Sequence, residues 1–448
     1  MWLTVILYFL SILIPGWLIL TLWFDTESRG GFKKIALSYG LGTMLLTTEI
    51  FLLVFVLRLP IKWLHYILGV EIVLGILLYL RRFGFDFIKR FKTEKKKISW
   101  IEGFLAFLIF CQFVLVNIFA WLKPVINWDS VAMWSFKAKI LFYNLSGFFN
   151  PNNQDFWQNQ NQSGYPWLVP LSQYWLAVLN KSFDEVLVNF IFVGFFVSII
   201  FLLYGYLRNY INRTSSLLFV WLFSTMPLIV THAHNAYADL PLAFYLGTAF
   251  ILTYKWLDTK NHKYLILSWL FLASALLTKN EAIIFVIAHL LILLFAKRGS
   301  GLGWKKILLS ALPALIIIAP WLGFKLVNKL SMNNVGGGLG WHPEIIGQLL
   351  SDLFAAASWN VWWYIFFGLS LLFIRQIIKD RSLRLVFGLW FLAMGGLLIL
   401  YVFTEEYQFA VDGTALSRNL INFVPSSVFL TGLLLRREFF TSNKFFGD

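Results

Sequence analysis

Long apolar runs recur along this chain, and they restrict it to one class of fold. A helix needs about twenty consecutive apolar residues to cross a bilayer, and runs near that length follow one another through the sequence. Only 13% of the 448 residues are charged, and the mean hydropathy is +0.73. We therefore predict an all-α polytopic membrane protein with about thirteen transmembrane helices. The predicted spans are 2–23, 34–57, 63–80, 101–121, 186–207, 215–231, 239–257, 264–278, 282–296, 306–323, 359–374, 385–403 and 417–435.

Basic residues predict how these spans are oriented. Lysine and arginine cluster in short loops, most densely between Arg81 and Lys97, and such loops normally face the cytoplasm. The span 101–121 then runs outward, which places the loop 122–185 outside the cell. A short, proline-interrupted apolar run at 166–179 is interpreted as interfacial or re-entrant. The later basic clusters all fall on the cytoplasmic side, with the N-terminus outside and the C-terminus inside.

The net charge of +15 follows from this loop pattern. It indicates contact with anionic membrane lipids rather than with nucleic acid. The single cysteine, Cys111, lies inside an apolar run, so neither a disulfide framework nor a cysteine metal site is expected. The first run, 2–23, lacks a basic n-region and is expected to be retained as a span. We divide the chain into a three-span extension with a basic cytoplasmic loop, 1–99, and a transmembrane core, 100–438.

Ionisable residues gather at the ends of spans on the predicted outer face. Polar groups at membrane depth are costly and usually functional, so their shared position predicts the lining of one interfacial cavity. They are Asp129 in the loop after the span 101–121, Asp239 at the start of a span, Lys279 and Glu281 in a short hairpin, and Arg418 at the start of the last span.

Each of these residues also has a purely structural interpretation. Asp129 fits a solvated interfacial loop, and Asp239 fits a carboxylate favoured at a helix N-terminus. Lys279 and Glu281 fit an ion pair that closes their hairpin. Arg418 fits a side chain that anchors its span at the membrane surface.

Two histidines precede Asp239 in the segment His232-Ala233-His234. Histidine nitrogens and carboxylate oxygens are ligands of divalent metal ions, so His234 and Asp239 are candidate ligands, and a divalent metal is a possible cofactor. An ordinary interfacial pair of histidines is the alternative.

Taken together, these ionisable residues indicate one kind of reaction more strongly than any of them does alone. A sugar on a polyprenyl phosphate presents its reactive carbon at the membrane surface, and its leaving group is an anion. Transfer of the sugar needs a carboxylate to accept the proton of an acceptor hydroxyl and cations to stabilise the departing phosphate. We assign Asp129 as the base, Lys279 and Arg418 as the phosphate-binding cations, and Asp239 and Glu281 as second, orienting acids.

In these segments the chain resembles the GT-C superfamily of polyprenyl-phosphate-sugar-dependent membrane glycosyltransferases. Members of the superfamily include protein O-mannosyltransferases and lipid A aminoarabinose transferases. The resemblance covers about residues 100–435. It rests on Trp128-Asp129, Tyr165 to Pro170, Tyr237 to Ala243, Leu276 to Glu281 and Arg418 to Pro425.

The resemblance implies a GT-C-like core whose first extracytoplasmic loop bears juxtamembrane helices, at about 131–143 and 166–179. It implies that Asp129 acts as the base or orients the acceptor. The implied partners are a polyprenyl-phosphate-linked sugar, membrane lipids, and a hydroxyl on an extracytoplasmic glycan, lipid or protein. The implied location is the bacterial plasma (inner) membrane with the active site facing outside. Some members use a divalent metal and others do not.

The chain also departs from the family pattern. Three spans precede the span 101–121 that leads into the first core loop, whereas many relatives begin near that span, and Ser130 stands where many relatives carry a second acid. Two other functions therefore stay open, a lipid-linked oligosaccharide flippase or transporter and a polysaccharide polymerase or ligase. Transporters tend to place charges at the bilayer midplane, whereas these residues lie at span ends, which favours the enzyme. A polymerase or ligase would use a late extracytoplasmic loop such as 325–358.

Overall fold

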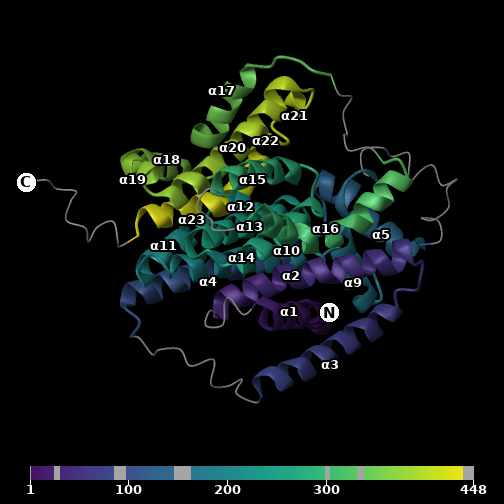
Figure 1. Cartoon of the computed structure of the whole chain (residues 1–448). Coiled ribbons are helices and arrows are strands. Elements are labelled where there is room, and N and C mark those ends of the chain that lie inside the picture. The colour runs from purple at the N-terminus through teal and green to yellow at the C-terminus, as the bar shows by residue number, and fades with distance from the viewer. Residues whose placement is uncertain are drawn as a thin grey trace, which may run out of the picture.

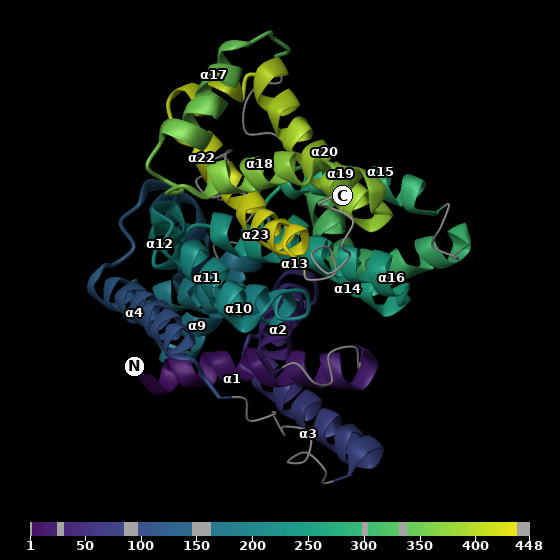
Figure 2. The ribbon, with the colours of Figure 1, turned by 90° about the vertical axis from the view of Figure 1, so that its left-hand side faces the viewer.

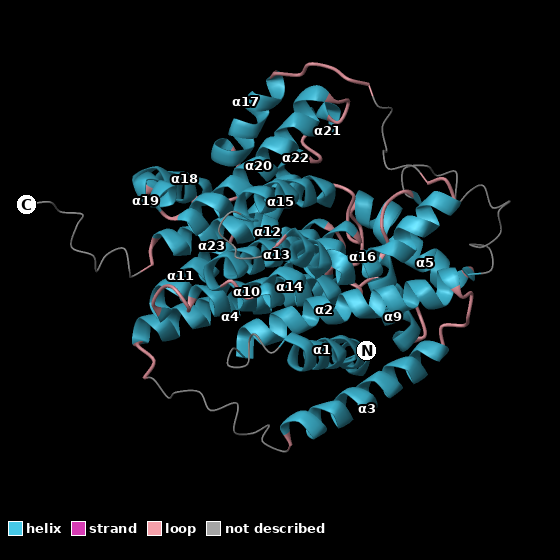
Figure 3. Ribbon diagram, in the orientation of Figure 1, coloured by secondary structure: helices cyan, strands magenta, loops and turns pink. Residues whose placement is uncertain are grey.

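The computed structural model describes residues 2–24, 31–84, 97–145, 163–297, 303–330 and 338–436. Within these ranges the regular structure is helical, apart from one isolated bridge between Leu339 and Thr404 (Figure 3). Every predicted span coincides with one to three consecutive helical segments, so the all-α polytopic fold class is confirmed. The basic loop at 85–96 lies outside the described residues.

Eight described helices are long and apolar enough to cross a membrane, and α11 with α12 would make a ninth if they form one bent span. The count of thirteen stays a prediction. The eight are α1 (Trp2–Ile19, continued by a π-helical turn to Phe24), α2 (Gly31–Phe51, continued likewise to Val56), α3 (Trp63–Phe83), α4 (Trp100–Leu122), α10 (Asn189–Leu207), α13 (Asp239–Thr259), α16 (Trp304–Val327) and α20 (Arg381–Phe403). Shorter apolar helices are α14 (His262–Leu276), α15 (Ala282–Ala296), α18 (Trp362–Leu372) and α23 (Val424–Leu434).

Helix α13 forms the centre of the bundle, and nearly all of it is buried. It packs against α10, α14 and α23. Figure 2 shows α10, α13 and α14 in the middle, with α1 and α3 below them and α17 (Glu344–Leu350), α18 and α20 above. The first residue of α13 is Asp239, so the fold carries this carboxylate into a fully packed environment.

The N-terminal helices α1 and α2 cross at very short range. A Cβ added to Gly16 would lie 1.9 Å from the carbonyl oxygen of Ser38, and one added to Gly42 would lie 1.9 Å from that of Ile12. Small residues of this kind let two membrane helices approach backbone to backbone. Helix α2 in turn packs against α10 and α9 (Leu168–Asn180). Thus α2 connects the predicted extension 1–99 to the core.

The predicted span 215–231 is broken in the structure into α11 (Arg213–Ser224) and α12 (Pro227–Ala233), which meet at an angle of 72°. The cause is Pro227, which lacks an N–H and disfavours the helical conformation of the residue before it. Met226 is accordingly extended, with φ −64° and ψ 122°. The bend redirects the chain between Met226 and Asp239, which sets the orientation of the two histidines in that segment.

Two helices occupy the predicted juxtamembrane positions in the loop after α4. A π-helical turn, Ser130–Trp134, leads into α5 (Ser135–Tyr143), and α9 begins at Leu168. The first ten residues of α9 are buried, because α5, α2 and α1 pack around it. Figure 1 shows α5, α9 and α16 gathered at one end of the bundle, on the right.

The predicted membrane orientation is tested by cysteine labelling from outside the cell. In a Cys111→Ser background, a cysteine at the exposed position Lys181 should react with a membrane-impermeant maleimide. A cysteine at the exposed position Lys97 should react only after the membrane is permeabilised, because the positive-inside rule places this loop in the cytoplasm. The opposite pattern would place Asp129 on the cytoplasmic side and contradict the orientation.

Candidate active site

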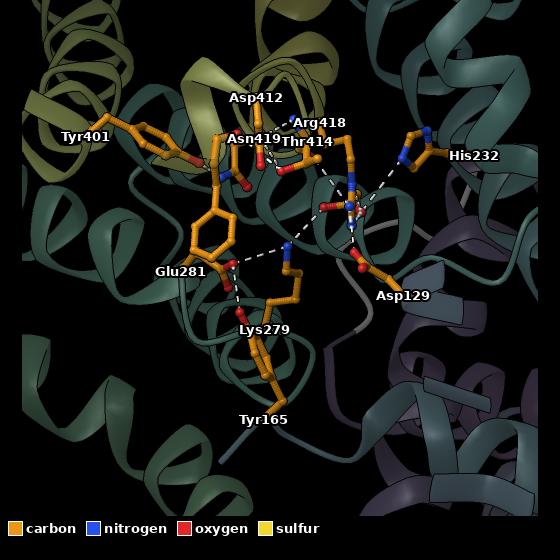
Figure 4. A network of polar contacts seen from close by, with 12 residues as sticks. Asp129, Tyr165, His232, Lys279, Glu281, Tyr401, Asp412, Thr414, Arg418 and Asn419 are labelled. Atoms are coloured by element: carbon orange, nitrogen blue, oxygen red, sulfur yellow. Dashed lines mark hydrogen bonds and ion pairs between the residues drawn. The ribbon is translucent and has the colours of Figure 1, made fainter. Parts of the chain in front are cut away.

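Arg418 joins two acids that are far apart in the sequence. Its Nη1 donates to Asp129 Oδ2 at 2.5 Å, and its Nε and Nη2 donate to Asp239 Oδ2 at 3.2 and 2.8 Å. Arg418 belongs to α22 (Leu416–Leu420), whereas Asp129 directly precedes α5's leading turn (Figure 4). The guanidinium also lies 4.4 Å from the ring centroid of Tyr237, a cation–π contact. One arginine thus holds the first core loop against the start of α13.

Lys279 extends this cluster on the other side of Asp239. Its Nζ lies 3.0 Å from Asp239 Oδ1 and 3.2 Å from Glu281 Oε1. The Tyr165 hydroxyl contacts the same Glu281 oxygen at 3.4 Å (Figure 4). The ion pair between Lys279 and Glu281 that the hairpin suggested does form, but Asp239 shares the ammonium. Three carboxylates therefore surround two cations, which leaves one excess negative charge when all five groups are ionised.

Burial differs sharply between the two aspartates. The side chain of Asp239 is 1% exposed, whereas that of Asp129 is 29% exposed. The N-cap residue of α13 is Ala238, and the Asp239 carboxylate accepts from Arg418 and Lys279. Asp239 is thus buried between both cations, whereas Asp129 is partly exposed to solvent.

The charge state of Lys279 follows from its neighbours. Burial lowers the pKa of an ammonium, but the carboxylates of Asp239 and Glu281 more than offset this and raise the pKa of Lys279 above its ordinary value. Lys279 therefore stays protonated throughout the physiological range.

The two histidines before α13 point to different partners. His232 Nε2 lies 3.7 Å from Asp239 Oδ2, and His232 Nδ1 donates to the carbonyl of Leu228 at 2.9 Å. His234 instead packs against Phe119 of α4, with ring centroids 5.0 Å apart. The structure therefore brings His232, rather than the candidate ligand His234, next to Asp239.

The cluster does not suit a divalent metal ion. Both oxygens of Asp239 accept from a cationic side chain, and Arg418 also donates to Oδ2 of Asp129. Across the described ranges, no group of three or more His, Cys, Asp and Glu side chains is arranged to hold a metal. A metal ion at this point would be repelled by the charges of Arg418 and Lys279, so we assign no metal-dependent step to this site.

Sequence reasoning brought together the five ionisable residues but missed part of their surroundings. The sequence gives Tyr237 only as part of the motif Tyr237 to Ala243. In the structure its ring faces the guanidinium of Arg418. The sequence predicts His234 as the histidine near Asp239, whereas His232 is the one that lies there. Tyr237 stands two positions before Asp239, and this closeness in sequence is the one signal that could have identified it.

Comparisons with known proteins agree with this architecture. Residues 165–324 match the family model of dolichyl-phosphate-mannose-protein mannosyltransferases, a range that includes Asp239, Lys279 and Glu281. No curated protein sequence matches the chain significantly.

A solved structure shares the fold, that of ArnT from Cupriavidus metallidurans in the apo state. The TM-score is 0.51 at 14% sequence identity, over 75% of this chain and 60% of the ArnT chain. This chain therefore covers less than two thirds of the length of ArnT, and at this identity the likeness concerns the fold. The family-model match over residues 165–324 and the fold shared with ArnT both agree with the resemblance of the sequence to the GT-C superfamily of membrane glycosyltransferases.

Proposed function

We propose that the protein transfers a sugar from a polyprenyl-phosphate donor to a hydroxyl group of an extracytoplasmic glycan, lipid or protein. The observation that carries this proposal is the bridge that Arg418 makes between the accessible Asp129 and the buried Asp239. In the bridge, Asp129, the proposed proton acceptor, lies next to a permanent cation. The proposed location is the bacterial plasma membrane, with this cluster on the outer face.

In the proposed reaction, the acceptor oxygen attacks the anomeric carbon of the donor sugar. The bond between that carbon and the phosphate oxygen breaks, its electron pair stays on the phosphate, and the acceptor proton passes to Asp129. The products are the glycosylated acceptor and polyprenyl phosphate. General-base assistance of this kind contributes typically about 10²- to 10⁴-fold to a rate.

The charge balance of the cluster gives Arg418 a role that changes during the reaction. In the resting state its charge is matched by Asp129 and Asp239. When Asp129 takes up a proton it becomes neutral, so Arg418 loses one of its two anionic partners. Its positive charge can then stabilise the negative charge that develops on the departing phosphate. An interaction that strengthens in the transition state raises the rate rather than ground-state binding. Lys279 would support the phosphate in the same way from its position between Asp239 and Glu281.

The function is tested with the purified protein and a synthetic short-chain polyprenyl-phosphate sugar. The expected result is release of polyprenyl phosphate that depends on an added acceptor. Cells that lack the protein should accumulate the corresponding polyprenyl-phosphate sugar in their lipid extract. Translocation of an intact fluorescent lipid-linked sugar, without cleavage of the sugar–phosphate bond, would instead identify a flippase.

Replacing Arg418 separates a catalytic cation from a membrane anchor. Arg418→Lys should lower turnover at saturating donor about 10- to 100-fold, because an ammonium cannot reproduce the bridge to two carboxylates. Arg418→Ala should be slower still and should also weaken donor binding. Arg436→Lys is the matched control, since Arg436 also pairs with an aspartate, Asp380. Wild-type turnover in both Arg418 variants would remove this residue from the site, because lysine and arginine anchor at a membrane surface almost equally well.

A further inference from the structure

Two cationic side chains meet where α13, α15 and α20 come together, at the ends of α13 and α15 that lie away from the acid cluster. Lys260, which follows α13, donates from Nζ to the carbonyl oxygen of Leu257 at 2.5 Å. Ser382 Oγ donates to the same carbonyl oxygen at 3.5 Å, so Arg381, the first residue of α20, lies beside it. Arg381 Nη2 in turn donates to the carbonyl of Ala296, the last residue of α15, at 3.2 Å. The two cations thus join the ends of three helices.

Neither of these two cations forms an ion pair in the described part of the chain. The two carboxylates nearest to them in sequence pair with other cations: Asp258 lies 4.0 Å from Lys255, and Asp380 bonds to Arg436. Burial and the charge of the neighbouring arginine lower the pKa of Lys260 below its ordinary value, although Asp258 partly offsets this. Two like charges at short range repel each other, so an anion bound between them is stabilised.

The helix ends explain each cation singly but not the pair. Basic side chains are favoured at helix C-termini, because the last carbonyls carry partial negative charge. An ammonium has three hydrogen-bond donors and a guanidinium has five. The carbonyl contacts use one nitrogen of Arg381 and leave donors of Lys260 unused. The remaining donors match the oxygens of a phosphate diester.

An exposed apolar stripe of α15 ends at these cations. Its residues recur at spacings of three and four and therefore lie on one face of the helix; they are Ile287, Leu290, Leu291, Leu294 and Phe295. The carbonyl of Phe295 accepts from the arginine at 3.3 Å, so the stripe and the cations are directly connected. Lipid chains cover such a stripe in a membrane. Cations at its end are complementary to an anionic headgroup carried on acyl chains.

We propose that Lys260 and Arg381 bind the phosphate of an anionic diacyl phospholipid, whose acyl chains lie along the exposed stripe of α15. The basic loops predict that these helix ends face the cytoplasm, and basic pockets between membrane helices on that side bind anionic headgroups. This lipid site goes beyond sugar transfer and does not depend on it. The bound lipid would hold two helices whose opposite ends lead to the acid cluster, since Asp239 begins α13 and Glu281 precedes α15.

The test is binding of phosphatidylglycerol to the purified full-length protein in a neutral detergent, counted by native mass spectrometry. The wild type should bind phosphatidylglycerol more tightly than zwitterionic phosphatidylcholine, and the difference should shrink as the salt concentration rises. Lys260→Asn and Arg381→Met should each raise the Kd for phosphatidylglycerol about 5-fold, the usual contribution of one basic residue at a membrane surface. An unchanged Kd in both variants would overturn the proposal.

Lys260→Asn should preserve the fold, and it has a matched control. Lys260 has φ 58°, in the left-handed region that asparagine adopts more readily than lysine. This variant therefore decides the question if Arg381→Met fails to fold. In the control, Lys181→Asn, the lysine also follows a helix, α9, with φ 60°, but it lies in the predicted extracytoplasmic loop. Lys181→Asn should bind as the wild type does. An equal loss of affinity in both lysine variants would reduce the effect to net charge and remove the site.

Two other ligands separate the headgroup from the chains. Glycerophosphoglycerol carries the same phosphate diester without acyl chains and should bind far more weakly than phosphatidylglycerol. Equal affinity for it would overturn the role of the α15 stripe and identify the cations as a site for a soluble anion. Equal affinity for phosphatidylcholine would overturn the role of the cations.

Thermal unfolding gives an independent readout. A ligand that binds only the folded protein raises the unfolding temperature as its concentration increases. Phosphatidylglycerol should therefore stabilise the wild type and Lys181→Asn, and should stabilise Lys260→Asn less at the same concentration. Equal stabilisation of all three proteins would contradict the proposal. Neither measurement involves sugar transfer, so a protein that binds this lipid but transfers no sugar would overturn the proposed function and leave the lipid site in place.

Discussion

Asp129→Asn should lower the rate of sugar transfer about 10²- to 10⁴-fold, the usual cost of losing a general base. Asparagine has nearly the size of aspartate but cannot take up the acceptor proton. Arg418 keeps its two hydrogen bonds to Asp239, so the site should remain assembled and donor binding should change little. The measurement is turnover at saturating donor and acceptor, together with donor affinity for the same purified variant.

Asp412→Asn is the control for this experiment. Asp412 is an exposed acid in the loop just before α22, where its carboxylate accepts from Thr414. Its replacement should leave turnover unchanged. If Asp129→Asn retained activity within a few-fold of the wild type, Asp129 would be a solvated loop residue and the base would have to be sought elsewhere.

Removing the charge of Asp239 should mainly destabilise the protein. This carboxylate is buried between Arg418 and Lys279, and removal of one partner from a buried ion pair costs about 3–5 kcal/mol because it leaves charge without compensation. We therefore expect Asp239→Asn to lower the thermal unfolding temperature of the purified protein clearly, in addition to abolishing transfer. A second replacement, Lys279→Met, should restore part of the lost stability, because one of the uncompensated cations is then gone.

The control for the Asp239 replacement is Asp258, which lies at the other end of α13. Asp258 is 38% exposed in its side chain and stands 4.0 Å from Lys255, and an ion pair of this kind contributes about 0–1 kcal/mol. Asp258→Asn should therefore hardly change the unfolding temperature. Equal effects of the two replacements would show that the cations around Asp239 are compensated from elsewhere.

The sequence was sufficient to predict the fold class and the membership of the cluster. Apolar runs determine helices in a membrane, because each backbone polar group there must be satisfied within its own segment. The alternation of basic loops placed Asp129, Asp239, Lys279, Glu281 and Arg418 on one face, and the structure brings all five together. Their roles in catalysis stay predictions.

What escaped prediction depends on side-chain direction and on contacts between distant segments. The bend at Pro227 determines that His232 rather than His234 faces Asp239. The proline is visible in the sequence, but the predicted span 215–231 runs through it without a break. Lys137 and Lys325 are 188 positions apart, and they donate to the neighbouring carbonyls of Tyr165 and Gly164. Nothing in their local sequence separates them from other lysines at a membrane surface.

Arg418 is also the last of the five cluster residues to leave the ribosome. Until α22 is made, Asp239 has Lys279 as its cation, and Asp129 lacks the guanidinium that holds its loop against α13. In a partly synthesised chain, the charges of Asp129 and Asp239 are therefore incompletely neutralised. The loop of Asp129 is also not yet joined to the start of α13 through Arg418. The cluster is therefore complete only once α22 is in place and Arg418 pairs with Asp129 and Asp239.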